Sequence, residues 1–307
     1  MCCVSALARF STERLRGVIK LSGKLFIIGT PIGNLEDISQ RVINALRGCS
    51  LIFVEDTRVS VKLLNHLGLS VPMLSCHKHN EHERLRALEK AASDNASVGL
   101  LSDAGMPLIS DPGEPLIQKA IELNMEIIPI AGPTAFVLAL VASGFDLSSF
   151  AFEGFLPDKE SLIIEKLARL KGETRTLVFY VSPHKLATTL KLMLQVLGDR
   201  RACLARELTK FYEEFVRLPL SELSAKYEEL EPRGELVLVL EGASASSTDY
   251  SDWQAVESQR QEVLEHVKRN LAHGLKLSKA AALAAEYFSI GKSDIYRASI
   301  AELKDSV

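Results

Sequence analysis

The chain has 307 residues, 47% of them hydrophobic and 24% charged, and its formal net charge is −3. This composition is that of a globular protein of about two domains, and it excludes a disordered chain. It also excludes a polycation, so any contact with nucleic acid must use a local basic surface.

The five cysteines are scattered without a C-x-x-C pair, which argues against a disulfide framework or a zinc site and favours a reducing compartment. No apolar run reaches the roughly 18 to 20 residues that a membrane span needs. Residues 1–23 carry four basic residues against one acidic residue. They read as a flexible extension of a cytoplasmic protein, with an organelle transit peptide as the alternative.

From Lys24 onward, short apolar strands alternate with amphipathic helices. This alternation indicates crossover units and a mainly parallel sheet buried on both faces, and it predicts a first α/β domain over residues 24–147. Strands are expected at 24–28, 51–57, 97–105 and 126–130, and helices at 38–50, 59–68, 79–93, 114–124 and 134–144.

The second half begins at "SFAFEGFLP", and its strands lie closer together, which predicts a mixed sheet in a second α/β domain over residues 148–243. Residues 244–252 form a Ser-rich linker. Residues 253–307 are expected to be wholly helical, with a turn at Gly291 that is typical of a helix-turn-helix unit.

Four segments interrupt the pattern at strand ends: "GTPIGNL", "EDTR", "SDAGMPLISDPG" and "PIAGPTA". Loops that follow parallel strands gather at one edge of the sheet, where open α/β folds bind ligands. Neither a P-loop nor a dinucleotide fingerprint is present. Asp103 and Asp111 would repel phosphate but suit a cationic or hydroxylated ligand, such as a nucleoside with an amino-acid tail and a sulfonium. Ordinary turn chemistry explains any one loop equally well.

Seven segments stand in the order of one family. In chain order they are "TPIGNLEDIS", "EDTR", "SDAGMPLISDPG", "PIAGPTA", "FEGFLP", "YVSPHK" and "ARELTKFYEEF". Over residues 24–242 the chain closely resembles the ribosomal RNA small subunit methyltransferase I family, in the tetrapyrrole methylase superfamily. The resemblance implies two α/β domains with S-adenosylmethionine in the cleft between them, usually in a homodimer. It also implies methyl transfer to the ribose 2′-oxygen of a cytidine in small-subunit (16S) ribosomal RNA, either free or in the assembled 30S-type subunit.

The resemblance and the loop chemistry together predict the cofactor-binding residues. They are Pro31, Gly33, Ser102, Asp103, Ala104, Gly105, Pro107, Ser110, Asp111, Pro112, Gly113, Gly132, Pro133 and Thr134. Met106, Ala131 and Val181 depart from the usual family pattern, and Val181 removes a carboxylate near the cleft.

Glu55, Asp56 and Arg58 follow the second strand and are the candidate catalytic residues. A carboxylate there would orient or deprotonate the hydroxyl, and the guanidinium would hold phosphate or the oxyanion. A local ion pair that only shapes the loop is the alternative.

Basic and histidine residues near the other strand ends are the candidate RNA contacts, namely His79, His184, Lys185, Arg206 and Lys210. No metal is expected, although "CHKHNEHE" has the side chains to hold one. The helical tail is either an RNA-docking or a packing module. The competing functions are a small-molecule methylase acting on a tetrapyrrole and a non-catalytic assembly factor.

Overall fold

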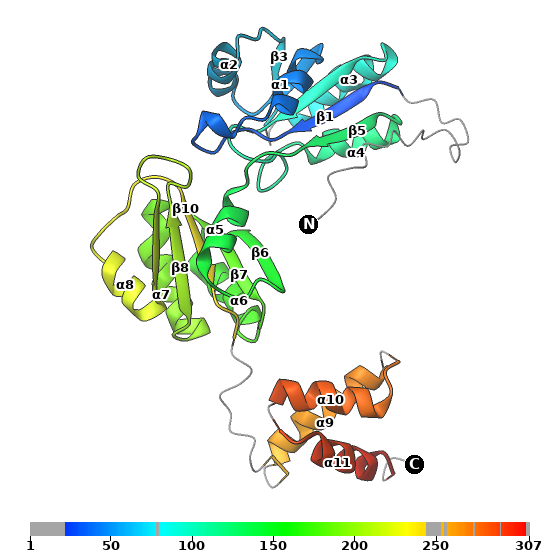
Figure 1. The fold of residues 1–307 in the computed structure, drawn as a ribbon, viewed down its shortest axis with the longest axis vertical. Coiled ribbons are helices and arrows are strands. Elements are labelled where there is room, and N and C mark those ends of the chain that lie inside the picture. The colour runs from blue at the N-terminus through cyan, green and yellow to red at the C-terminus, as the bar shows by residue number, and fades with distance from the viewer. Residues whose placement is uncertain are drawn as a thin grey trace, which may run out of the picture.

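The computed structural model describes residues 22–77, 80–243, 253–254, 257–272, 274–288 and 290–304. Two α/β bodies are followed by a group of three helices (Figure 1). The predicted linker and nearly all of the predicted N-terminal extension lie outside the described residues.

The first body is built on a parallel sheet of order β3-β2-β4-β1-β5. Its strands are continuous apolar runs because helices cover both faces. The strands are β1 (Lys24–Ile28), β2 (Leu51–Val54), β3 (Met73–Ser75), β4 (Ser97–Leu101) and β5 (Glu126–Ile130).

Two clusters of buried side chains fill the two faces of this sheet. Alternation along β4 divides them, since Leu100 packs with α3 and α4 while Leu101 packs with α1 and α2. The covering helices are α1 (Gln40–Arg47), α2 (Thr57–His66), α3 (Glu81–Ser93) and α4 (Glu114–Glu122), with a short 3-10 turn, η1 (Leu35–Asp37), before α1.

Strand β3 was not predicted from the sequence. It has three residues and pairs only with β2, at the edge of the sheet. A segment this short carries no measurable hydrophobic period, so only its pairing with Ile52–Val54 defines it as a strand.

The second body contains a mixed sheet of order β6-β7-β10-β8-β9, as predicted. Only the β6–β7 pair is parallel, and the other pairs are antiparallel. The strands are β6 (Phe150–Phe155), β7 (Thr176–Val181), β8 (Arg201–Arg206), β9 (Glu214–Pro219) and β10 (Leu236–Leu240). The helices are α6 (Glu160–Arg169), η2 (Pro183–Lys185), α7 (Leu186–Leu197) and α8 (Leu220–Tyr227).

Helix α5 (Ala135–Ser143) follows β5 but packs on the second sheet. Ala139 and Leu140 are buried against Val178 and Val239 of β7 and β10. Ile32, from the loop after β1, is buried in the same cluster. The loop after β1 and helix α5 therefore pack together against the face of the second sheet. The domain boundaries at 147 and 243 remain predictions, and the packing of α5 favours an earlier first boundary.

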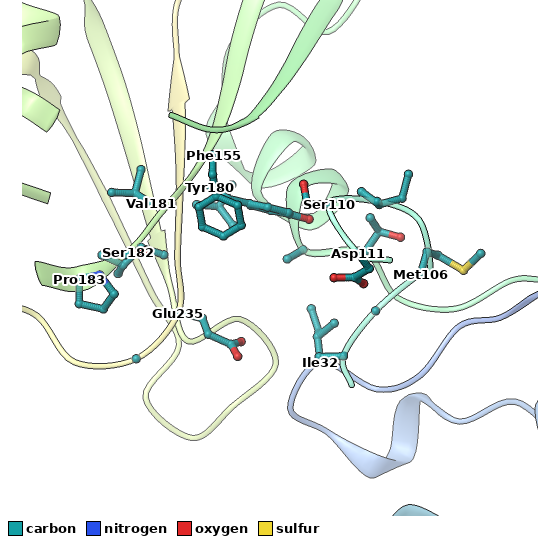
Figure 2. Close-up of a pocket in the computed structure, with 18 residues that line it drawn as sticks. Ile32, Met106, Ser110, Asp111, Phe155, Tyr180, Val181, Ser182, Pro183 and Glu235 are labelled. Carbon is teal, nitrogen blue, oxygen red and sulfur yellow. The ribbon is translucent and has the colours of Figure 1, made fainter. Parts of the chain in front are cut away.

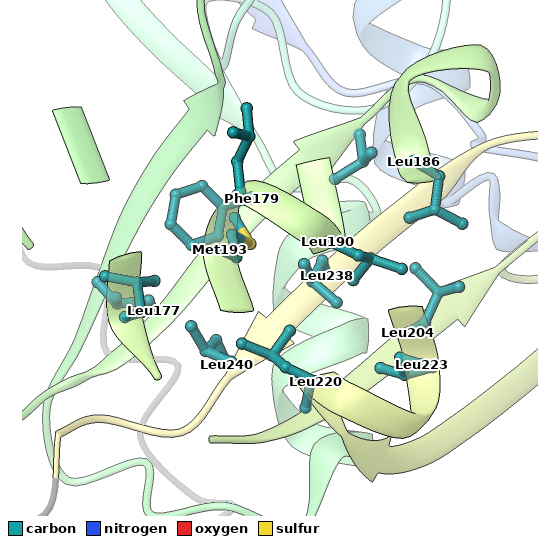
Figure 3. Close-up of a cluster of buried hydrophobic side chains, with 14 of the residues drawn as sticks. Leu177, Phe179, Leu186, Leu190, Met193, Leu204, Leu220, Leu223, Leu238 and Leu240 are labelled. Carbon is teal, nitrogen blue, oxygen red and sulfur yellow. The ribbon is translucent and has the colours of Figure 1, made fainter. Parts of the chain in front are cut away.

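The main core of the second body lies between its sheet and helices α6, α7 and α8 (Figure 3). Most of the labelled side chains there are leucines, and all of the labelled ones are buried. The labelled residues are Leu177, Phe179, Leu186, Leu190, Met193, Leu204, Leu220, Leu223, Leu238 and Leu240.

Replacing Leu238 by alanine should lower the free energy of unfolding by about 2–5 kcal/mol, because the truncation leaves a cavity in a close-packed core. Leu238 is 0% exposed and lies on the central strand of the sheet. Ile121→Ala is the control, since Ile121 is 62% exposed and its truncation should cost almost nothing. Urea denaturation measures both, and equal midpoints would contradict the assignment of this core.

The last described residues form α9 (Glu257–Ala272), α10 (Leu277–Phe288) and α11 (Lys292–Lys304). They pack around a core of their own that includes Val263, Ala281 and Ile295. The predicted helical tail is confirmed, with the break between α10 and α11 at the predicted turn. Its role in RNA docking or packing stays a prediction.

Candidate active site

Two neighbouring strands of the first sheet, β1 and β4, send the chain to opposite faces. The helix that follows β1 covers the face of α1 and α2, and the helix that follows β4 covers the face of α3 and α4. Such a reversal leaves a crevice at the carboxyl ends of the strands. Thr30 and Gly105 exchange two backbone hydrogen bonds across it, at 2.9 and 3.0 Å between nitrogen and oxygen.

A cavity of about 310 Å³ lies at this edge, between the loops of the first sheet and the strand ends of the second (Figure 2). Its volume is at the lower end of the range for small-molecule sites. The first body contributes Ile32, Ala104, Gly105, Met106, Ile109, Ser110, Asp111, Thr134 and Ala135, the last from the start of α5. The second body contributes Phe155, Tyr180, Val181, Ser182, Pro183, Gly234, Glu235, Leu236 and Val237.

The charged groups that line the cavity are both acidic. Asp111 comes from the loop after β4 and Glu235 directly precedes β10, and among the described residues no lysine, arginine or histidine lines the cavity with them. Tyr180 also lines the cavity, and burial raises the pKa of its phenol, with a further rise from the two carboxylates. The cavity therefore favours a ligand with positive charge.

Five of the predicted cofactor residues line this cavity: Ala104, Gly105, Ser110, Asp111 and Thr134. Ser102 lies behind the wall, where its hydroxyl donates a hydrogen bond to the Gly105 carbonyl at 3.2 Å. Seven others belong to the same loops but do not line the cavity: Pro31, Gly33, Pro107, Pro112, Gly113, Gly132 and Pro133. Asp103 points into a neighbouring hollow.

Gly132 does not line the cavity, but the close packing of two backbone segments requires a glycine at this position. A Cβ atom at Gly132 would lie 2.6 Å from Cα of Gly29, so the backbones after β1 and β5 pass too close for any side chain. This close approach carries the chain from β5 to Thr134 and Ala135 in the cavity wall.

The loop after β4 holds two non-glycine residues in the left-handed region. Leu108 has φ 74° and Ser110 has φ 70°. Each costs on the order of 1–3 kcal/mol, so the surrounding contacts must fix the loop shape. Strain of this kind is concentrated at functional sites.

The candidate catalytic residues line a separate, open hollow of about 390 Å³ at the ends of β2, β3 and β4. Its lining residues are Glu55, Asp56, Thr57, Arg58, Ser75, His77 and Asp103. The hollow adjoins the cavity, because Asp103 faces one while the next two residues, Ala104 and Gly105, line the other.

Asp56 caps helix α2, and its carboxylate accepts hydrogen bonds from the backbone and the guanidinium of Arg58. Arg58 holds the pKa of Asp56 at about 2. The backbone N–H of Asp56 donates to the Asp103 carboxylate at 3.1 Å. Burial nevertheless raises the pKa of Asp103. The two carboxylates are therefore unequal proton acceptors.

Each described cation among the candidate RNA contacts is paired with a carboxylate. Lys185 bonds Asp158, Arg206 bonds Glu214 at 3.0 Å, and Lys210 bonds Glu207 at 2.7 Å. His184 and Lys185 lie in η2, where Ser182 makes no side-chain capping bond. His79 lies outside the described residues. Whether any of them contacts RNA stays a prediction.

In the part of the chain that the structure describes, no three His, Cys, Asp or Glu side chains come together as metal ligands. None of its helices combines the length and the apolar character needed to cross a membrane.

Comparisons with known proteins address the family directly. The model of the Tetrapyrrole (Corrin/Porphyrin) Methylases matches residues 24–224. A ribosomal RNA small subunit methyltransferase I from Pseudomonas aeruginosa is 41% identical over 285 residues, which are 91% of this chain and 97% of that protein. The chain belongs to the tetrapyrrole methylases, in the ribosomal RNA small subunit methyltransferase I group. This confirms the resemblance that the sequence motifs carry.

Another methyltransferase I, from Thermotoga maritima, is 42% identical over 220 residues, which are 72% of this chain and 99% of that protein. Solved structures show the tetrapyrrole methylase fold at lower identity. Diphthine synthase has a TM-score of 0.55 at 15% identity, over 71% of this chain and 90% of its own. The uroporphyrin-III-C-methyltransferase of Thermus thermophilus has a TM-score of 0.52 at 18% identity, over 71% of this chain and 94% of its own. The predicted fold class is thus confirmed.

Residues from the second body of this methylase were the main omission of the sequence analysis. Phe155 and Tyr180 lie in motifs that were recognised, but nothing in the sequence assigned them to the cavity. Val181, expected near the cleft from the family pattern, does line it. Glu235 directly precedes a wholly buried strand, β10, whose sequence indicates core. Because β10 runs antiparallel to β7, its start lies at the edge where β7 ends. Strand direction is not visible in one sequence.

Proposed function

We propose that this chain is an S-adenosylmethionine-dependent methyltransferase that methylates the ribose 2′-hydroxyl of a cytidine in small-subunit ribosomal RNA. The observation that carries the proposal is the 41% identity to a small subunit methyltransferase I over nearly its whole length. The test is transfer of a labelled methyl group to purified small subunits, with a porphyrinoid as the competing acceptor. Label in the porphyrinoid alone would overturn the proposal.

The residues of the cavity fit S-adenosylmethionine. Its cationic sulfonium and ammonium groups match a cavity whose charges are Asp111 and Glu235. Apolar side chains at Ile32, Val181 and Leu236 suit the adenine ring. When bound, the cofactor supplies a methyl group that its positive sulfur has already activated. What remains for the protein is to align the acceptor, exclude water and remove a proton.

The hollow beside the cavity contains the groups that would handle this proton. Asp56 is a poor base at neutral pH, because Arg58 stabilises its ionised form. Asp103 is the better acceptor, since burial favours its protonated form and raises its pKa. Arg58 is 88% exposed and lies where it can meet an RNA phosphate. Glu55, Asp56 and Arg58 therefore remain candidates, with Asp103 added as the base.

Asp103→Asn should lower the single-turnover rate of methyl transfer by about 100-fold or more, the usual worth of a general base. Asp56→Asn should lower it by less than about tenfold, because asparagine can still accept the capping bond. The wild-type rate should fall as pH drops through the raised pKa of Asp103, since the ionised base is then lost. Rate profiles from pH 4 to 9 measure this, and full activity of Asp103→Asn would remove Asp103 from the reaction.

We also propose, from the family resemblance, that the protein is a homodimer. Helix α5 and the start of β6 offer an apolar surface for it, because Val137, Val141 and Phe150 are 42%, 64% and 43% exposed. Exposed apolar residues that gather in one area are typical of subunit contacts. Sedimentation equilibrium at micromolar concentration tests the proposal, and a monomer mass would contradict it.

A further inference from the structure

Two exposed aromatic side chains lie next to each other on the loop between β8 and β9. Phe211 is 92% exposed and Tyr212 is 67% exposed, and their ring centroids lie 5.0 Å apart in an edge-on arrangement. We name residues 207–213 the aromatic loop. Of the exposed large hydrophobic side chains in the described part of the chain, Phe211 is the most exposed.

The aromatic loop is held rigidly in place. The Glu207 N–H donates to the Glu235 carbonyl at 3.0 Å, and the Glu235 N–H donates to the Glu207 carboxylate at 3.0 Å. The Lys210 ammonium donates hydrogen bonds to the side-chain carboxylates of Glu207 and Glu235, at 2.7 and 3.2 Å. The Thr209 N–H donates to the Glu213 carboxylate at 2.7 Å. The exposure of the rings is therefore a property of a fixed loop.

The backbone of the aromatic loop is also strained. Glu207 has φ 51° and Thr209 has φ 67°, and the left-handed region is rare for a β-branched residue such as Thr209. The buried hydroxyl of Thr209 has no hydrogen-bond partner among the described residues. The fold keeps this unfavourable geometry while it presents two aromatic rings to solvent, which points to a function of the loop.

The aromatic loop adjoins the cavity through Glu235 and also contacts the loop after β1. Glu235 lines the cavity and anchors the loop. A Cβ atom at Gly33, in the loop after β1, would lie 2.4 Å from Cγ of Lys210. The rings therefore stand on a segment that adjoins the site and contacts both bodies.

We propose that Phe211 and Tyr212 form a stacking platform for an unpaired base of the RNA that carries the acceptor ribose. The inference rests on the proposed function and names how the RNA is held. Exposed aromatic rings bind unpaired bases by stacking, and this contact needs no charge. That suits the loop, because its cation Lys210 is already paired with Glu207 and Glu235. Duplex RNA hides its base faces and would not use the platform.

A second copy of the chain is the other partner such rings could take. A stable interface buries roughly 800 Å² from each partner. Two aromatic side chains supply at most roughly 150–250 Å² each. Their neighbours Lys210, Glu213 and Glu214 are charged, whereas interface cores are depleted in charge. The observations thus favour an RNA base.

The test compares the wild type with the double variant Phe211→Ala/Tyr212→Ala, using small subunits as acceptor. The KM for the subunits should rise about tenfold or more, while the affinity for S-adenosylmethionine and the sedimentation mass stay unchanged. Phe211→Trp should retain the wild-type KM. Leu230→Ala is the matched control, since Leu230 is 56% exposed and lies in another loop.

A single-stranded RNA oligonucleotide containing 2-aminopurine reports the stacking itself. Its fluorescence should be quenched by the wild type and not by the double variant. If the double variant kept both the wild-type KM and the quenching, the platform would be overturned. It would also be overturned if the double variant kept the wild-type KM but sedimented at half the wild-type mass, a result that would assign the rings to contact with a second copy. Absence of methyl transfer by the wild type would instead overturn the proposed function.

Discussion

Gly132→Ala should reduce methyl transfer by about 100-fold, because a displacement of about 1 Å at a reacting site has that effect. The added Cβ would lie 2.6 Å from Cα and 2.8 Å from the carbonyl carbon of Gly29. Both contacts are with backbone, so the segment that leads to Thr134 and Ala135 must move. The cavity wall moves with it, and the affinity for S-adenosylmethionine should fall in parallel.

The matched control for this glycine is Gly172→Ala. A Cβ atom at Gly172 would meet nothing within 4 Å, and its φ is not in the left-handed region. This variant should keep wild-type activity. Calorimetry with S-adenosylmethionine and a urea melt together separate a displaced wall from a lost fold. Wild-type binding and activity of a folded Gly132→Ala protein would show that this segment does not shape the site.

Asp111→Asn should weaken the binding of S-adenosylmethionine by about tenfold, which corresponds to about 1.4 kcal/mol. Asp111 is one of two charged groups in the cavity wall, and both are carboxylates. Removing one lowers the attraction for a cation in a partly buried site, where charges interact more strongly than in water. S-adenosylhomocysteine should lose less affinity, because its sulfur is neutral.

Asp94→Asn makes the same chemical change at the exposed end of helix α3 and should leave both affinities unchanged. Titration calorimetry of both ligands against the three proteins measures the difference. Equal losses for the sulfonium and the thioether would contradict the assignment of Asp111 to the sulfonium, and no loss for either would remove it from the cofactor site.

The sequence predicted the architecture because it repeats a strong physical pattern. Apolar strands such as Lys24–Ile28 and amphipathic helices such as Gln40–Arg47 show their periods without any tertiary contact. The loops after β1, β4 and β5 were predicted to meet, and they do, because parallel strands share one direction.

Features that depend on tertiary contacts were not visible in the sequence. Helix α5 has apolar residues around its whole circumference, so its pattern did not say which sheet it covers. Asp103 and Ala104 are neighbours in sequence, yet the backbone turn sends one to the hollow and the other to the cavity. The pairing of Lys210 with Glu207 and Glu235 joins residues of two different strand ends.

Mapping of ribose methylation along small-subunit ribosomal RNA tests the central claim most directly. Small subunits from cells that lack this chain are incubated with S-adenosylmethionine and either the wild type or Gly132→Ala. The wild type is expected to add a 2′-O-methyl group at a cytidine, and the variant should add it about 100-fold more slowly. Identical methylation maps with and without the wild-type protein would contradict the account.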